Sequence, residues 1–110
     1  MAPLPNSTQA ILDLRKLEDY CLDPKHPRGR HKARVFRELL GIGRNDARWL
    51  QCELLLALTD GDAFELSADK FGRRWRLDVT VARQEQRAVI RTLWLIRTGE
   101  EFPRFVTCWV

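Results

Sequence analysis

The sequence predicts an α+β fold in which two to three N-terminal helices pack on a four-stranded antiparallel sheet. Apolar residues recur at helical spacing as far as about residue 58, and beyond Gly61 they alternate with polar residues as they do in strands. Short polar turns separate the alternating stretches, which is typical of hairpins. Helices followed by hairpin-linked strands indicate a single sheet with helices on one of its faces.

Three helices are predicted from the apolar spacing, and each has a stop signal behind it. Asp13 can cap the first helix, and Pro24 ends it because the residue before a proline avoids helical dihedrals. Gly41 ends the second helix, and Gly61 follows the third. The predicted ranges are 13–22, about 30–40 and about 45–58.

Four strands are predicted after the third helix, over 63–68, about 74–81, 88–97 and 104–110. The third strand carries apolar residues on both faces, so we expect it to be central, and the sequence leaves open which face meets the helices. Arg91 in this strand would be costly to bury without an anion or a carboxylate, and Asp78 is the candidate partner.

The composition indicates one ordinary globular domain. The 110 residues are 45% apolar and 31% charged, which suits a single core but not two. We expect residues 1–9 to form a loose tail and 10–110 to form the domain. No secretory signal pattern and no membrane-length apolar run occurs, so we expect a cytoplasmic protein. The three cysteines lack C-x-x-C spacing, so we expect buried reduced thiols, with no metal and no cofactor.

Positive charge is concentrated in residues 24–37. This segment holds six Lys or Arg and both histidines and contributes +6 to a net charge of +4, so the rest of the chain sums to −2. Such a segment repels itself unless an anion lies nearby, although many charge runs are simply solvated. On the second helix, Lys32 shares a face with Phe36, four residues on. Lys32 either extends over the core into water or stabilises a bound phosphate, with His31 as a proton carrier.

Other basic and aromatic residues are candidates for holding a nucleic acid. Arginines alternate with apolar residues in the second and third predicted strands, beside tryptophans that can serve either as core or as stacking platforms for bases. No nucleophile elbow, P-loop, zinc-protease or dinucleotide motif is present. The candidate nucleic-acid-binding residues are Lys25, His26, Arg28, Arg30, Arg34, Arg76 and Trp94.

The same segment resembles a small bacterial domain family of unknown function. The family pattern is Lys-Leu-x-x-Tyr-x-Leu-x-Pro-x-His-Pro-x-Gly-x-x-Lys-Ala-x-x-Phe, followed by a Gly-x-x-Trp/Tyr strand and a final Pro-x-x-x-Thr. The matching residues are Lys16, Leu17, Tyr20, Leu22, Pro24, His26, Pro27, Gly29, Lys32, Ala33, Phe36, Gly72, Trp75, Pro103 and Thr107. The match covers nearly the whole chain from about residue 14. Members vary at the position of His31, which favours Lys32 over His31 as the indispensable residue.

That family is in turn similar to the helix-then-four-strand ribonucleases, barnase and the RelE-like toxins. This similarity at the level of the fold implies the toxin of a bacterial toxin–antitoxin type system, a metal-independent ribonuclease that acts on RNA. The implied catalytic residues are Lys32 and Arg91 on the phosphate, His31 or His26 for protons and Thr107 to orient the phosphate. The implied partner is an acidic antitoxin or immunity protein.

Two other functions fit the same residues. The chain can be a non-catalytic basic module that binds nucleic acid or an acidic protein. It can also be the neutralising half of a pair, which its basic charge disfavours because the partner of a nuclease tends to be acidic. Loss of function on a single substitution, Lys32→Ala, separates catalysis from binding by a patch of many charges.

Overall fold

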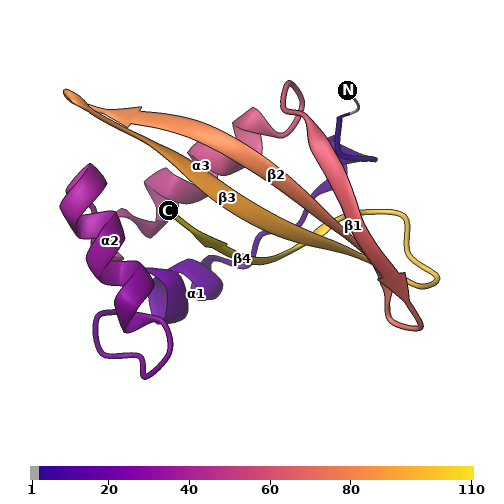
Figure 1. Ribbon diagram of the computed structural model, residues 1–110, viewed down its shortest axis with the longest axis horizontal. Helices are drawn as coiled ribbons and strands as arrows, with labels where there is room; N and C mark the ends of the chain where they lie inside the picture. Colours follow the sequence, from indigo (N-terminus) through magenta and orange to yellow (C-terminus); the bar gives the residue numbers. More distant parts are fainter. Residues whose placement is uncertain (1–2) are drawn as a thin grey trace.

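The computed structural model describes residues 3–110 as helices on one side of a curved sheet (Figure 1). The helical elements are the 3₁₀ turn η1 (Ser7–Gln9), α1 (Leu14–Lys16), the π-helical turn η2 (Leu17–Cys21), α2 (Arg30–Leu40), the 3₁₀ turn η3 (Arg44–Asp46) and α3 (Ala47–Ala57). The strands are β1 (Ala63–Asp69), β2 (Gly72–Arg83), β3 (Gln86–Arg97) and β4 (Arg104–Trp109). This confirms the predicted fold class.

The sheet is an antiparallel meander in which each strand pairs with its neighbour in sequence, in the order β1-β2-β3-β4. In Figure 1, α3 lies behind β2 and β3, and α1 and α2 lie beside the end of β4. The end of the edge strand β4 therefore lies beside α2, the helix that carries part of the basic segment. None of the helices in the described range 3–110 is long and apolar enough to cross a membrane.

Strand β3 shows which face of the sheet meets the helices. Its inward side chains are almost fully buried: Ala88, Ile90, Thr92 and Trp94. The Thr92 hydroxyl donates to the Leu77 carbonyl and accepts from the Trp94 indole N–H at 2.8 Å, so this buried polar group has partners. Val89 and Arg91 point outward, and the outer face of the sheet stays uncovered.

The N-terminal segment is not a loose tail where the structure describes it. Leu4 is only 1% exposed and belongs to the core, and the Asn6 side chain donates to the Glu101 carbonyl at 2.6 Å. Ile11 then pairs with Arg104 of β4 in a short parallel bridge. Apolar Leu4 offsets the polar composition of this segment, which was the reason for predicting a tail. Met1 and Ala2, also in the predicted tail, lie outside the described residues.

The first predicted helix forms in two parts. Asp13 caps α1 by accepting a hydrogen bond from the Arg15 backbone N–H, as predicted. The chain then widens into the π-helical η2, where the Leu22 N–H donates to the Leu17 carbonyl at 2.9 Å. A π turn adds one residue to the helix and rotates the side chains that follow. Tyr20 and Cys21 lie in this turn, next to β4.

Candidate functional site

Lys32 is held at the edge of the sheet by contacts from three elements. It lies in the first turn of α2, and its Nζ donates to Thr107 Oγ1 of β4 at 2.7 Å. The same Nζ lies 4.9 Å from the centre of the Tyr20 ring and 5.4 Å from that of Trp109. Two aromatic faces attract the ammonium at these distances. The side chain is therefore fixed toward β4, and does not extend freely into water.

Thr107 links Lys32 to a buried thiol. Cys21 Sγ lies 3.7 Å from Thr107 Oγ1, and Cys21 is 0% exposed. Because the lysine donates to the threonine oxygen, the threonine's own proton is free to point at the sulfur. Lys32, Thr107 and Cys21 thus form one hydrogen-bonded chain that runs from the surface into the core. The structure brings Lys32 and Thr107 together although 75 positions separate them.

The Cys21 thiol is the more acidic member of a buried cysteine pair. Its pKa is lowered to about 6, against the effect of burial, chiefly by its hydrogen bond with the Cys108 side chain and also by Thr107 and the Lys32 charge. The same side-chain contact, together with burial, raises the pKa of Cys108. The first proton to leave the pair therefore leaves Cys21, opposite the Lys32 ammonium. Cys52, by contrast, is exposed, so the prediction that all three thiols are buried is wrong for that residue.

His26 organises the loop that leads into α2. Its Nδ1 accepts hydrogen bonds from the backbone N–H groups of Arg28 at 3.0 Å and Gly29 at 2.9 Å. Since both bonds need a lone pair on Nδ1, the ring proton is on Nε2. The imidazole also meets the Tyr20 ring edge-on, with the ring centres 4.7 Å apart. Tyr20 therefore touches both His26 and Lys32, and only Nε2 of His26 is free to exchange a proton.

His31 lies on a different side of α2 from Lys32. It is exposed and lines a pocket on the helix, together with Arg30 and Arg34. The 100° step between successive helical residues separates it from the Lys32–Thr107 contact. The structure does not place His31 in contact with Lys32 or Thr107.

Arg91 lies on the open face of the sheet, next to the Lys32 contact. It is paired in register with Trp109, whose ring touches Lys32. The Arg91 Nε donates to Asp78 Oδ1 at 3.2 Å, which confirms the predicted ion pair. Arg76 lies 3.8 Å from the same carboxylate and its Nε forms no hydrogen bond with the described residues. Two guanidinium groups share one carboxylate, so this part of the sheet keeps a net positive charge.

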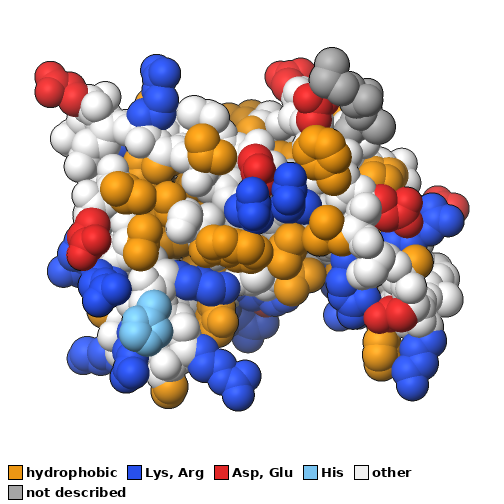
Figure 2. Space-filling view, viewed as in Figure 1, with side chains coloured by type: hydrophobic (Ala, Val, Ile, Leu, Met, Phe, Trp, Pro, Cys, Tyr) orange, Lys and Arg blue, Asp and Glu red, His pale blue; other side chains and the backbone are white. Residues whose placement is uncertain are grey.

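Most of the remaining predicted contact residues are accessible, with one clear departure. Figure 2 shows Lys and Arg side chains gathered over α2 and the neighbouring loop, and further basic side chains among apolar ones on the open sheet. The exposed members of the loop and helix are Lys25, Arg28, Arg30 and Arg34. Trp94, however, is 0% exposed and bonded to Thr92, so no base can stack on it. Trp109, which pairs with Arg91 and contacts Lys32, is the partly exposed tryptophan of this region.

The chain matches one family over residues 3–110, described as "Domain of unknown function (DUF6883)". It belongs to that family. No curated protein and no solved structure matches the chain. Within residues 3–110, no group of three His, Cys, Asp or Glu side chains is placed so that it could hold a metal ion.

Three residues of the DUF6883 site were not among the predicted site residues. Tyr20, Cys21 and Trp109 surround the Lys32–Thr107 contact, and all three resemble ordinary core residues in the sequence. Tyr20 carried a signal, because it stands in the Lys-Leu-x-x-Tyr part of the quoted pattern. The lysine of that pattern, Lys16, has a structural role: its Nζ donates to the Phe105 carbonyl at 2.7 Å and ties α1 to β4.

Proposed function

We propose that this DUF6883 domain is a metal-independent ribonuclease, the toxin of a bacterial toxin–antitoxin type system. The observation that carries the proposal is the Lys32 ammonium, which lies within the basic segment and is fixed by Thr107 at the edge of the sheet. No carboxylate within residues 3–110 forms an ion pair with this ammonium. A preorganised cation without a carboxylate partner suits a group on which negative charge increases during a reaction.

The reaction that fits is attack of a ribose 2′-OH on the adjacent phosphate. The O2′–P bond forms and the P–O5′ bond breaks, which leaves a 2′,3′-cyclic phosphate and a 5′-hydroxyl. Lys32 stabilises the charge on the phosphate, and Arg91 adds a second cation from the open sheet. One imidazole takes the 2′-OH proton and a donor returns a proton to O5′. His31 is the candidate base, and His26 is the candidate donor because its Nδ1 is engaged by two backbone N–H groups and its Nε2 carries the proton. Thr107 orients the phosphate through Lys32.

Two further observations support a toxin ribonuclease. The element order, helices and then a four-stranded antiparallel meander, resembles the helix-then-four-strand order of barnase and the RelE-like toxins, a likeness at the level of the fold. The uncovered sheet beside Lys32 offers positive charge from Arg76 and Arg91, together with the Trp109 ring. An acidic antitoxin or immunity protein would complement the same surface and block it.

The test is cleavage of total RNA in EDTA by the wild-type protein and by two matched lysine variants. Lys32→Met removes the fixed ammonium, and Lys70→Met removes an exposed ammonium from the β1–β2 turn. Circular dichroism and thermal unfolding confirm that each variant is folded. We expect cyclic-phosphate products from the wild type and from Lys70→Met, and a loss of about 10²–10³-fold for Lys32→Met, the range for removal of one oxyanion donor. Intact RNA in every sample, across several RNA classes, overturns the proposal.

A non-catalytic binding module is the second candidate, and the exposed arginines of α2 favour it. Arg30 and Arg37 form no ion pair with any residue of the described range, so their charges remain available to a partner. In a binding module, affinity declines gradually as any one of several charges is removed. Activity that depends strongly on Lys32 and little on Lys70 supports the ribonuclease. Affinity that falls by a small step for each charge removed supports the binding module.

A further inference from the structure

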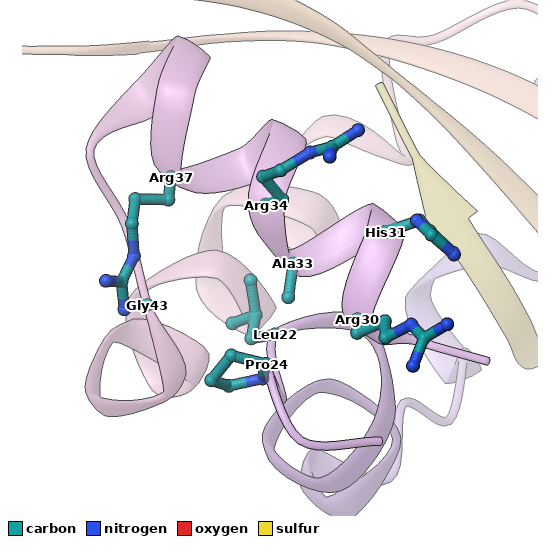
Figure 3. Close-up of a pocket in the computed structure, with 8 residues that line it drawn as sticks. All are labelled: Leu22, Pro24, Arg30, His31, Ala33, Arg34, Arg37 and Gly43. Atoms are coloured by element: carbon teal, nitrogen blue, oxygen red, sulfur yellow. The ribbon is translucent and has the colours of Figure 1, made fainter. Parts of the chain in front are cut away.

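A pocket lies against α2, which lines it with Arg30, Ala33, Arg34 and Arg37 (Figure 3). It has a volume of about 340 Å³, with an apolar floor made by Leu22, Pro24 and Ala33. Arg30, Arg34 and Arg37 line it with positive charge, and Figure 3 shows Arg37 on one side and Arg30 on the other. An apolar floor with a few convergent polar groups is the usual form of a ligand site, and this volume is at the small end of such sites.

The arginines of this pocket share one face of α2 because they are four and three residues apart. Arg34 approaches Glu38 only loosely, at 3.9 Å, with both side chains about two-thirds exposed. Arg30 and Arg37 have no ion-pair partner within residues 3–110. Asp23, in the adjoining depression, accepts from the Lys25 backbone N–H. Within residues 3–110, Arg30 and Arg37 therefore form no ion pair, and Arg34 is only loosely paired.

The pocket is separate from the Lys32 site. Lys32 does not line it, and the helical step of 100° per residue places Lys32 on the opposite side of α2 from Arg30, Arg34 and Arg37. A helix with its side chains is about 10–12 Å across, so a ligand in contact with both places must extend past the N-terminal turn of α2. That path carries the exposed Lys25 and Arg28. A flexible polyanion can follow such a path.

We propose that this pocket is a subsite for one nucleotide of a single-stranded RNA whose chain also reaches Lys32. The base lies on the Leu22, Pro24 and Ala33 floor, and the guanidinium groups hold its phosphates and stack on its plane. Arginine suits both tasks, because its fork matches a phosphate and its flat face stacks on aromatic rings. The subsite rests on the proposed ribonuclease function, because it extends the contact with the substrate beyond the cleaved bond.

The test measures binding apart from cleavage. A fluorescein-labelled octanucleotide with 2′-O-methyl ribose throughout lacks the attacking hydroxyl, so it binds without being cut. Its affinity is measured by fluorescence anisotropy for the wild type, for Arg30→Gln/Arg37→Gln and for the control pair Arg73→Gln/Arg87→Gln, which removes two exposed arginines from the sheet. Cleavage of an ordinary RNA octanucleotide by the wild type is measured in parallel.

We expect the pocket pair to bind about tenfold or more weakly than the wild type, and the control pair to bind within about threefold of it. The slope of log affinity against log salt should fall by about 1.4 for the pocket pair, at about 0.7 for each lost contact between a single strand and the protein. An abasic octanucleotide should lose affinity for the wild type but little for the pocket pair, because the floor then has no base to hold.

Three results overturn the subsite. The first is that the pocket pair and the control pair weaken RNA binding equally, and the second is that the wild type binds abasic and normal strands with equal affinity. The third is displacement of the RNA by polyglutamate at the same charge concentration, which would indicate an acidic protein as the ligand. Failure of the proposed function has a different signature: the wild type leaves the ordinary octanucleotide intact while the difference between the pocket and control pairs in binding remains.

Discussion

Gly29 is the residue whose replacement tests most directly how the Lys32 site is built. A Cβ added at Gly29 would lie 2.0 Å from the Tyr20 carbonyl oxygen and 2.8 Å from its carbon. The backbone conformation is ordinary, with φ −81° and ψ −17°, so the cost of alanine comes from this overlap alone. The backbone of Gly29 is held on both sides, by His26 Nδ1 and by the Ala33 N–H. It cannot move away from Tyr20 without breaking those bonds.

We expect Gly29→Ala to lower the free energy of unfolding by about 2–3 kcal/mol, the upper part of the usual range for overpacking. The measurement is urea denaturation followed by tryptophan fluorescence and circular dichroism. Gly43→Ala is the matched control, because its Cβ would lie 3.6 Å from the nearest atom, Arg37 Nη2, at φ −136°. The control should stay within about 0.5 kcal/mol of the wild type. A Gly29→Ala protein as stable as the control would refute the close contact between the loop and η2.

Three other predictions concern the same cluster. Thr107→Val keeps the shape of the side chain but removes the Lys32 acceptor, so RNA cleavage should fall about 10–100-fold in single-turnover assays; unchanged cleavage would contradict the role of the contact. The lowered pKa of Cys21, about 6, stabilises the fold above the unfolded pKa near 9. Stability in reductant should therefore fall from pH 9 toward 6, and Cys21→Ala should flatten that part of the curve. His26→Leu should cost about 1–3 kcal/mol in urea denaturation because two backbone N–H groups lose their acceptor. In His26→Asn the amide oxygen can accept from the same two backbone N–H groups, so stability should be restored. Cleavage should not be restored if Nε2 of the imidazole transfers a proton in the reaction.

The order and type of the elements could be predicted because the hydrophobic period changes once, after Gly61. The stop signals at Pro24 and Gly41 are equally local, and Gly41 indeed ends α2 with φ 67°. The polar composition of the N-terminal segment predicts a tail, yet buried Leu4 and the hydrogen bond of Asn6 attach this segment to the domain. Composition averages over a segment, whereas packing depends on single residues.

The orientation of β3 could not be predicted, for a different reason. Both faces of the strand carry large apolar residues, so alternation alone does not tell inside from outside. The inward face is the one that holds Thr92, a polar residue, because the Leu77 carbonyl and the Trp94 indole satisfy its hydroxyl. Those partners become neighbours only when the strands pair. The same strand register buries Trp94 and leaves Trp109 accessible.

Only part of the candidate site could be predicted from the sequence. Lys32 was singled out by its local charge and by the helical spacing to Phe36. Its contact with Thr107 depends on the pairing of β4 with β3, and the involvement of Cys21 depends on the π turn that rotates the residues after Leu17. Local periodicity predicts neither the contact of Lys32 with Thr107 nor the involvement of Cys21. Cys21 and Trp109 have the composition of core residues, and only the fold places them around an ammonium.

The charge state of this cluster links its stability to its chemistry. Lys32 faces a hydroxyl and two aromatic rings, and within residues 3–110 the group able to neutralise it is the Cys21 thiol, through Thr107. When Cys21 is ionised, the lowered pKa stabilises the fold and the thiolate offsets the ammonium. When Cys21 is protonated, the fold loses that contribution and the ammonium is left to attract an external anion. A bound phosphate and the Cys21 thiolate therefore compete for the same positive charge. Protonation of Cys21 therefore favours phosphate at Lys32 and at the same time makes the free protein less stable. This is expected for a site in which the ligand supplies the missing partner of a charged group.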